Sequence, residues 1–362
     1  MKKISIIFNQ TSLLFRSMFF SLISVVVQAQ DSKPTVMTNK QKTEIIDLFA
    51  SNLNKKYVFP DVALKVENKI KANNKKGLYS KITDGRVFAD SVSNEASKIS
   101  NDKHLRVFYK SEAPSSVNAA SDSIEIKKRA DSRRQFLIRF NFGFTKIAIL
   151  DGNVGYLKID GFVSVQDVEK IISSAMTFLT NTNAIILDLT DNRGGEPETV
   201  RLVASYFFAA EPIHINDIYF REENKTEEFW TLKDLSGERY LNKPVYILTS
   251  NQTFSGGEEF AYDLQILKRA TIVGQTTKGG ANPGETFTLK DGFSAFIPTG
   301  KAINPITKIN WEGTGVKPDI ELNPENIVNE THILSLKKLI ETTEDLQTKK
   351  FFESALGKIS AK

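Results

Sequence analysis

The chain of 362 residues contains no cysteine, only three histidines, four methionines and two tryptophans. Without cysteine the protein can form no disulfide, carries no cysteine-linked lipid and has no thiol nucleophile or iron–sulfur ligand. Three isolated histidines without a His-Glu-x-x-His sequence leave no zinc-binding pattern, and no Gly-rich phosphate loop of either common type is present. The sequence therefore predicts a protein without metal or other cofactor.

The charge balance gives little indication of a nucleic-acid partner. The formal net charge is +5, and removal of residues 1–29, which hold three basic residues and no acid, lowers it to +2. The lysines are spread over the predicted helix faces rather than gathered into one stripe. We expect no nucleic acid among the partners.

The first 29 residues have the features of a secretory signal peptide. Lys2 and Lys3 precede an apolar run from Ser17 to Val27, and small residues around Ala29 provide a cleavage site. The run is too short to span a membrane, although an uncleaved N-terminal anchor is an alternative. We predict export to the periplasm or exterior of a bacterium, with no stable membrane span after cleavage. The oligomeric state is not indicated.

Apolar residues recur at helical spacing between residues 38 and 100, which predicts three amphipathic helices. Their stripes contain Ile45, Leu48, Phe49 and Leu53, then Ala63, Val66 and Ile70, then Val87, Val92, Ala96 and Ile99. We predict a small N-terminal helical domain over residues 36–108. Residues 109–135 are polar with little periodicity, so a linker or an exposed excursion is expected there.

Strands alternate with helices in the second half of the chain, which predicts an α/β domain with a largely parallel central sheet. The clearest elements are the apolar strand 184–189, the hairpin of 287–289 with 293–297, and a helix over about 326–341. We predict a core over residues 136–345 and a C-terminal tail over 346–362. Loops that follow the strand ends of such sheets host the chemistry.

Ser255 stands where an apolar strand, Val245–Leu248, gives way to a helical pattern. Gly256 and Gly257 leave the backbone open, and the N–H groups of the first helical turn lie ready for a developing oxyanion. Ser255 followed by Glu258 is also a capping box, which starts many helices without any catalytic role. The residues alone leave both interpretations open.

A serine nucleophile needs a base, and the chain offers only three histidines. His214 and His332 lie in a polar stretch and on a terminal helix, so both are interpreted as structural. His104 lies at the junction of the helical domain and the polar stretch, where clefts form. Glu312, a carboxylate among glycines, could orient an imidazole or be a surface acid in a turn.

Two adjacent glycines, Gly194 and Gly195, follow the buried strand that ends at Asp188. Their N–H groups could face an anionic centre, although an ordinary glycine turn is the simpler interpretation. Asp188 itself is interpreted as a structural acceptor for nearby loop amides.

In these segments the sequence resembles the serine peptidases of the tail-specific (C-terminal processing) and tricorn group. Within that group it is most similar to the branch related to interphotoreceptor retinoid-binding protein. The matching segments are 102–107, 153–157, 188–195, 249–262, 269–281 and 311–319, in the family's order, within a similarity over about residues 40–340. The resemblance implies a ClpP/crotonase-like α/β core with a mostly parallel sheet, preceded by a small helical bundle.

The resemblance also implies roles for individual residues. Ser255 would be the nucleophile, and the Gly256 amide with that of Gly194 or Gly195 would form the oxyanion hole. The lysine base of tail-specific peptidases would fall on Gly280, so that form of dyad is missing.

The tricorn-like branch instead uses an early histidine and a late glutamate, which correspond to His104 and Glu312. Lys103 takes the place of a serine that precedes this histidine in tricorn, and Lys278 is the alternative base.

The function implied is that of an exported serine-type peptidase, a hydrolase that acts on peptide or protein substrates through an acyl-enzyme. The alternative is a binding protein for lipid or retinoid-like small molecules on the same scaffold. The likeness to a retinoid carrier and the 25 phenylalanines support that alternative. An ester hydrolase with the same acyl chemistry is a further possibility.

Overall fold

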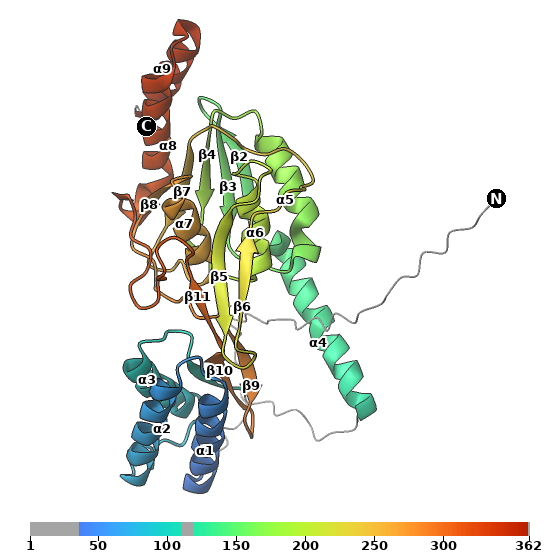
Figure 1. Cartoon of the computed structure of the whole chain (residues 1–362), viewed down its shortest axis with the longest axis vertical. Coiled ribbons are helices and arrows are strands. Elements are labelled where there is room, and N and C mark those ends of the chain that lie inside the picture. The colour runs from blue at the N-terminus through green and yellow to red at the C-terminus, as the bar shows by residue number, and fades with distance from the viewer. Residues whose placement is uncertain (1–35, 111–118, 361–362) are drawn as a thin grey trace, which may run out of the picture.

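The computed structural model describes residues 36–110 and 119–360, so the predicted signal peptide lies outside the described residues. Three helices form the N-terminal part: α1 (Asn39–Lys56), α2 (Pro60–Lys75) and α3 (Gly85–Ser100). Helix α1 begins behind Thr38, α2 begins with a proline, and Asp84 accepts the first N–H groups of α3. The three predicted helices are confirmed, and they pack against one another in one bundle (Figure 1).

A sheet of six strands forms the centre of the second part, whose arrangement Figure 1 shows. Its order is β12 (Ile320–Glu321), β8 (Thr271–Gly274), β7 (Val245–Thr249), β4 (Ala184–Asp188), β3 (Val154–Ile159) and β2 (Phe144–Leu150). Every neighbouring pair is parallel except β2 with β3. The predicted mostly parallel sheet is confirmed.

Helices cover both faces of this sheet, which explains why β4 and β7 are buried at every position. Ile185 and Leu187 of β4 face α5 (Val165–Leu179), α6 (Pro197–Ser205) and α7 (Gly256–Ile266) in one core cluster. Ile186, one residue apart, packs in a second cluster with α8 (Ile327–Thr342) and α9 (Leu346–Ser360). The alternation of side chains along the strand thus supplies both cores.

Two smaller sheets join the helical part to the core. One contains β11 (Gly300–Ile303), β5 (His214–Phe220) and β6 (Lys225–Trp230), and the other contains β1 (Arg106–Tyr109), β10 (Phe293–Pro298) and β9 (Gly284–Thr288). The hairpin expected from the sequence is β9–β10. Strand β1 begins two residues after His104 and pairs with β10, so the pairing carries this histidine to the core.

Two segments are more regular than the sequence suggested. Helix α4 (Ala119–Arg139) occupies most of the stretch expected as a linker, and α9 forms where a tail was expected. Helix α4 is polar on most sides and shows no apolar stripe, which explains why periodicity missed it. Short 3-10 turns at Asn141–Gly143 and Pro324–Asn326 complete the described elements.

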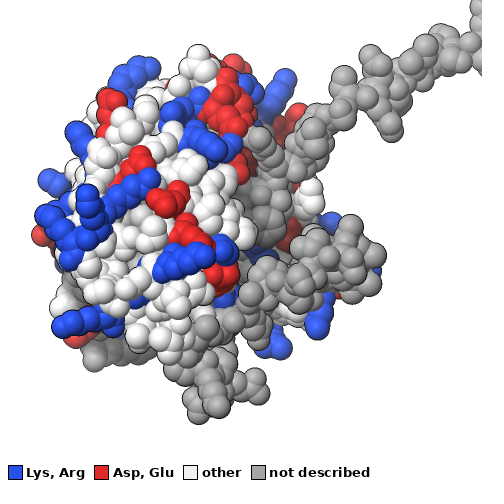
Figure 2. Space-filling model, turned by 90° about the horizontal axis from the view of Figure 1, so that it is seen from below, with Lys and Arg blue, Asp and Glu red and all other residues white. Residues whose placement is uncertain are grey.

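Basic and acidic side chains are interspersed on the face that Figure 2 shows, with no large patch of one sign. No helix in the described part of the chain is both long and apolar enough to cross a membrane.

Candidate active site

Ser255 lies at the turn between β7 and α7 and is almost fully buried. Its backbone has φ +55° and ψ −123°, a conformation that residues other than glycine rarely adopt. A serine held this way between a strand and a helix presents its hydroxyl at a sharp turn, as nucleophilic serines do. The expected transition from strand to helix at this residue is therefore confirmed.

Glu258 holds this turn from one helical turn away. Its Oε2 accepts hydrogen bonds from the backbone N–H groups of Ser255 and Gly280, both at 2.8 Å. Its Oε1 accepts from the Gly279 N–H and the Thr277 hydroxyl, both at 2.5 Å. Burial raises the pKa of this carboxyl to about 7 in spite of the four donors. The capping contact that the sequence suggested is present, and the same side chain also anchors the loop opposite Ser255.

The amides near Ser255 are not equivalent. The Gly194 N–H donates to the Asn192 side-chain oxygen at 2.8 Å. The Gly195 and Gly256 N–H groups, by contrast, donate to no acceptor among the described residues. They also lie side by side, since a Cβ added to Gly256 would stand 3.1 Å from the Gly195 nitrogen. The geometry favours Gly195 over Gly194 as the partner of Gly256 in an oxyanion hole.

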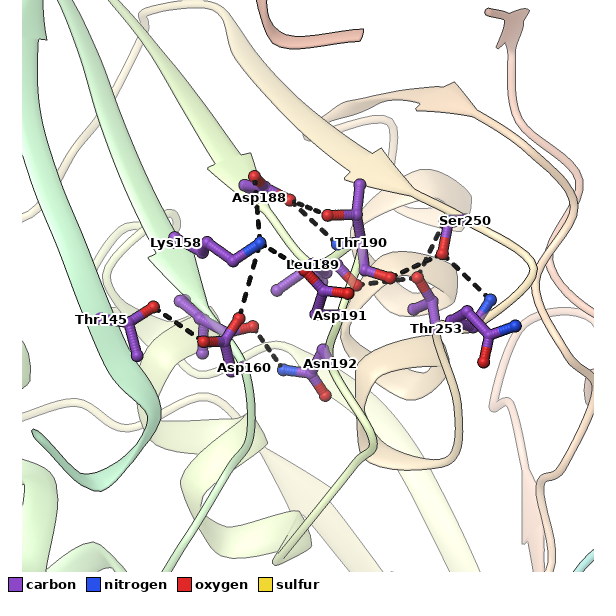
Figure 3. Close-up of polar contacts among 12 residues, drawn as sticks. Thr145, Lys158, Asp160, Asp188, Leu189, Thr190, Asp191, Asn192, Ser250 and Thr253 are labelled. Atoms are coloured by element: carbon purple, nitrogen blue, oxygen red, sulfur yellow. Dashed lines mark hydrogen bonds and ion pairs between the residues drawn. The ribbon is translucent and has the colours of Figure 1, made fainter. Parts of the chain in front are cut away.

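Strand β4 fixes the start of the loop that carries these glycines (Figure 3). Asp188 accepts the Thr190 N–H at 3.0 Å through one oxygen and the Tyr156 hydroxyl at 2.6 Å through the other. Lys158 reaches Asp191, the next loop residue, at 2.6 Å. The interpretation of Asp188 as a structural acceptor is confirmed.

The same loop is attached to the turn that precedes Ser255 (Figure 3). The Ser250 hydroxyl donates to the Thr190 carbonyl at 2.6 Å, and the Thr253 hydroxyl donates to the Leu189 carbonyl at 2.8 Å. Asn192, fully buried, accepts the Phe254 N–H at 3.0 Å through its own carbonyl. These contacts fix the amide-bearing loop and the serine relative to each other.

The His104 ring lies against the residue that precedes Ser255. Its centroid is 4.4 Å from that of Phe254 and 5.8 Å from that of Phe296, and the histidine is only 1% exposed. Burial, together with the positive charge of Lys278, lowers the pKa of His104 to about 3. The imidazole is therefore neutral at neutral pH, which is the state a general base requires.

Gly280, the position on which the resemblance placed the lysine base of tail-specific peptidases, has no room for a side chain. A Cβ at this position would stand 2.8 Å from Cε1 of His104 and 2.2 Å from Cε2 of Phe254. Both rings occupy the space that a side chain at position 280 would need.

Two carboxyl groups flank the imidazole. The ligand atoms of Asp102, His104 and Glu312 all lie within 4.8 Å of one another. Glu312 Oε2 accepts the N–H groups of Ala281 and Asn282 at 2.6 and 3.1 Å, which fixes it beside the histidine. Burial and the charge of Asp102 raise the pKa of Glu312 to about 8.

Asp102 is the residue that the sequence analysis missed, although it belongs to the motif around His104. One of its oxygens accepts the His104 backbone N–H at 3.0 Å, and the other accepts from Tyr57 and Asn282, both at 3.1 Å. Burial raises its pKa. A negative charge on one of two carboxyl groups this close in a buried site disfavours a negative charge on the other.

The same three side chains offer the donor types of a metal site, one imidazole and two carboxylates. Asp102, however, already uses both oxygens for protein donors. This arrangement favours a role in orienting the imidazole.

The remaining candidates lie at or outside the edge of the site. Lys278 places its ammonium 4.8 Å above the Phe254 ring, and burial with nearby positive charges lowers its pKa. His214 stacks on Trp230, and His332 bonds to the Asp151 carbonyl at 2.7 Å. Both of these histidines are in structural positions, as expected.

Comparison with known proteins gives two family matches. Residues 153–322 match the description "Peptidase family S41", and residues 30–150 match "N-terminal domain of Peptidase_S41 in eukaryotic IRBP".

Curated relatives match a shorter region. The chloroplastic carboxyl-terminal-processing peptidase 2 of Arabidopsis thaliana is 26% identical over 171 residues, 46% of this chain and 31% of that protein. The carboxyl-terminal-processing protease of Synechocystis sp. is 28% identical over 155 residues, 42% of this chain and 34% of that protein. The matches thus span about a third of these relatives' length.

Solved structures agree on the fold. Mature CPAF superposes with a TM-score of 0.53 at 13% identity, with 89% of this chain and 96% of that chain covered. A putative peptidase from Parabacteroides merdae gives a TM-score of 0.51 at 16% identity, with 88% and 96% covered. The expected α/β architecture behind N-terminal helices is confirmed.

Proposed function

The chain belongs to peptidase family S41, and on this premise we propose that it is an exported serine-type peptidase. Ser255 would attack the peptide carbonyl, His104 would act as base, and Glu312 would support the imidazole. Export to the periplasm or exterior rests on the predicted signal peptide. The proposal on location is independent of the proposal on chemistry.

One observation carries the proposal: a single oxygen of Glu258 accepts the backbone N–H groups of both Ser255 and Gly280. Gly280 in turn abuts the His104 ring, which also packs against Phe254, the residue before Ser255. Residues from three distant parts of the chain therefore meet at one turn. This convergence supports a nucleophile and base that act together.

The reaction would proceed in two acyl-transfer steps. As the Ser255 hydroxyl attacks the carbonyl carbon, its proton passes to the neutral imidazole of His104. The oxyanion that forms is accepted by the Gly195 and Gly256 N–H groups. The imidazolium then returns the proton to the leaving amine as the C–N bond breaks. Water, deprotonated by the same imidazole, hydrolyses the acyl-enzyme and regenerates Ser255.

The acid pair has a defined part in this scheme. A positive imidazolium in a buried site is costly unless a negative charge lies close by. Glu312 and Asp102 together supply that charge within 4.8 Å of the ring atoms. They stabilise the imidazolium without having to take its proton.

Labelling with a serine-directed fluorophosphonate tests the proposal. Wild type is expected to be labelled on Ser255, and Ser255→Ala is expected to lose both the label and the cleavage of a peptide library. Ser91→Ala, on helix α3 away from the site, is the matched control and should behave as wild type. Undiminished labelling of Ser255→Ala would remove this serine from its role. Co-purified lipid, with neither labelling nor peptide turnover, would support the alternative of an apolar-ligand carrier.

A further inference from the structure

We propose that a cluster of basic side chains beside the Ser255 turn recognises acidic side chains in the part of the substrate that leaves after the bond is cut. This inference rests on the proposed function, because it assigns the substrate class of the same site. The members of this basic cluster share a position next to the segments that carry the nucleophile and its base, and they are Lys103, Arg106, Arg193 and Lys278.

Two members of the basic cluster are attached to the turn that leads into the nucleophile. Arg193 donates from Nη1 to the Gln252 carbonyl at 2.7 Å. The Lys278 backbone N–H donates to the Thr253 carbonyl at 3.0 Å, and the Lys278 ammonium group lies 4.8 Å from the centroid of the Phe254 ring. Both residues are therefore anchored to the three residues directly before the serine.

The other two members lie next to the histidine. Lys103 directly precedes His104, and its ammonium group donates to the Lys278 carbonyl. Arg106 begins β1 two positions after His104, and it pairs in register with Phe296, whose ring centroid is 5.8 Å from that of the imidazole. In the proposed mechanism His104 returns its proton to the leaving amine, so we expect cations beside it to face the leaving part of the substrate.

The charge of the basic cluster is not neutralised by the described acids. None of the four residues forms an ion pair with an acid in the described part of the chain. Burial, and then the positive charges of the other three members, lower the pKa of Lys278. Glu258 acts on this pKa in the opposite direction, but it is fully buried and its two oxygens accept four protein donors. Charges of one sign beside an active site attract ligands of the other sign.

The basic side chains are accessible and suited to carboxylates. Lys103 is exposed, and the other three members are half-buried. The side-chain hydrogen bonds of Arg193 within the described residues use Nη1 alone, so the guanidinium keeps further N–H groups that can face the two oxygens of a carboxylate. Four cations exceed the single charge of a terminal carboxylate, so the cluster suits a segment with more than one acidic side chain.

Two matched peptides carrying a fluorophore and a quencher test the inference. In a peptide that wild type cleaves, the two residues after the cut bond are made Glu-Glu in one substrate and Gln-Gln in the other, with the C-terminus amidated in both. Glutamine has nearly the shape of glutamate without its charge. For wild type at low salt we expect kcat/KM for the Glu-Glu peptide to be about tenfold higher, the size of two partly exposed ion pairs. In about 1 M salt the ratio should fall to about one, because charges are then screened beyond about 3 Å.

Lys278→Met should lower the ratio at low salt to about threefold or less. Methionine keeps an apolar stem over the Phe254 ring and lacks the charge, so KM for the Glu-Glu peptide should rise while kcat changes little. Lys337→Met is the matched control, because Lys337 is exposed on α8, which packs on the other face of the sheet from α7. It should keep the wild-type ratio. An equal loss in both variants would overturn the inference, since the net charge and not the basic cluster would then be responsible.

Wild type alone also decides the inference, even if a variant does not fold. Equal cleavage of the two peptides, or a ratio that salt does not change, would overturn it. The same pair of substitutions before the cut bond should give a smaller ratio, and an equal or larger ratio there would overturn the assignment to the leaving side. A gain that comes only from a free C-terminal carboxylate, with no difference between Glu-Glu and Gln-Gln, would also overturn it.

Fluorophosphonate labelling of Ser255 separates this inference from the proposed function. Labelling together with equal cleavage of the two peptides leaves the peptidase proposal intact and refutes the role of the basic cluster. No labelling and no cleavage of any peptide refutes both.

Discussion

Substitution of Gly280 by alanine is the most direct test of how the base is held. The added Cβ would stand 2.2 Å from Cε2 of Phe254 and 2.8 Å from Cε1 of His104. Carbon atoms in contact prefer about 3.5 Å or more, so the overlaps are about 1.3 and 0.7 Å. The two rings are 2% and 1% exposed and have no room to withdraw.

The size of the effect follows from these overlaps. Overpacking of this kind typically costs about 1–3 kcal/mol of unfolding free energy. A shift of the imidazole by about 0.7 Å should reduce kcat up to about 100-fold, because reacting groups tolerate little misplacement. The measurements are urea unfolding and the rate of peptide cleavage, with fluorophosphonate labelling as a second measure of Ser255 reactivity.

Gly357→Ala is the matched control. A Cβ at Gly357, on helix α9, meets nothing within 4 Å. This variant should therefore gain about 0.5–1 kcal/mol, because alanine is the better helix former. If Gly280→Ala proved as stable and as active as wild type, the packing of His104 and Phe254 around this glycine would be refuted.

Three further predictions concern the groups around the serine. In peptide-cleavage assays His104→Ala should lower kcat by about 100-fold or more, whereas Lys278→Met should change kcat by less than about threefold. A larger loss of kcat in Lys278→Met than in His104→Ala would make Lys278 the base. Asn192→Ala removes two buried side-chain hydrogen bonds, to the Gly194 N–H and the Ile159 carbonyl. The free energy of unfolding measured in urea should therefore fall by about 1–3 kcal/mol, and kcat should fall by more than KM changes. Because the folded-state pKa of Glu258 is raised to about 7 from 4.5, its contribution to stability is full below about pH 4.5 and is lost as the pH rises through 7. This fall in the free energy of unfolding amounts to up to about 3 kcal/mol, and Glu258→Gln should flatten it. If the free energy of unfolding fell equally steeply with pH in wild type and Glu258→Gln between pH 5 and 8, the burial of this acid would be contradicted.

The sequence alone determined the local elements on which the site stands. The apolar run of β4 and β7 predicted buried strands, and the glycines after Ser255 predicted a helix start with open backbone. These signals act over a few residues, so they are visible in a pattern. Helix α9 could have been found in the same way, since Phe352, Ala355 and Ile359 form one buried stripe. Helix α4 could not, because it carries no such stripe.

Only the tertiary structure decided which of these elements meet. The pairing of β1 with β10 brings His104 against Phe254, 150 positions later in the chain, and no periodicity encodes a contact over that distance. Two further features depend in the same way on packing between remote segments: the double use of Glu258 and the closeness of Asp102 to Glu312. A sequence pattern specifies backbone conformation and buried faces, whereas the chemistry of the site arises from distances that exist only after those faces have packed.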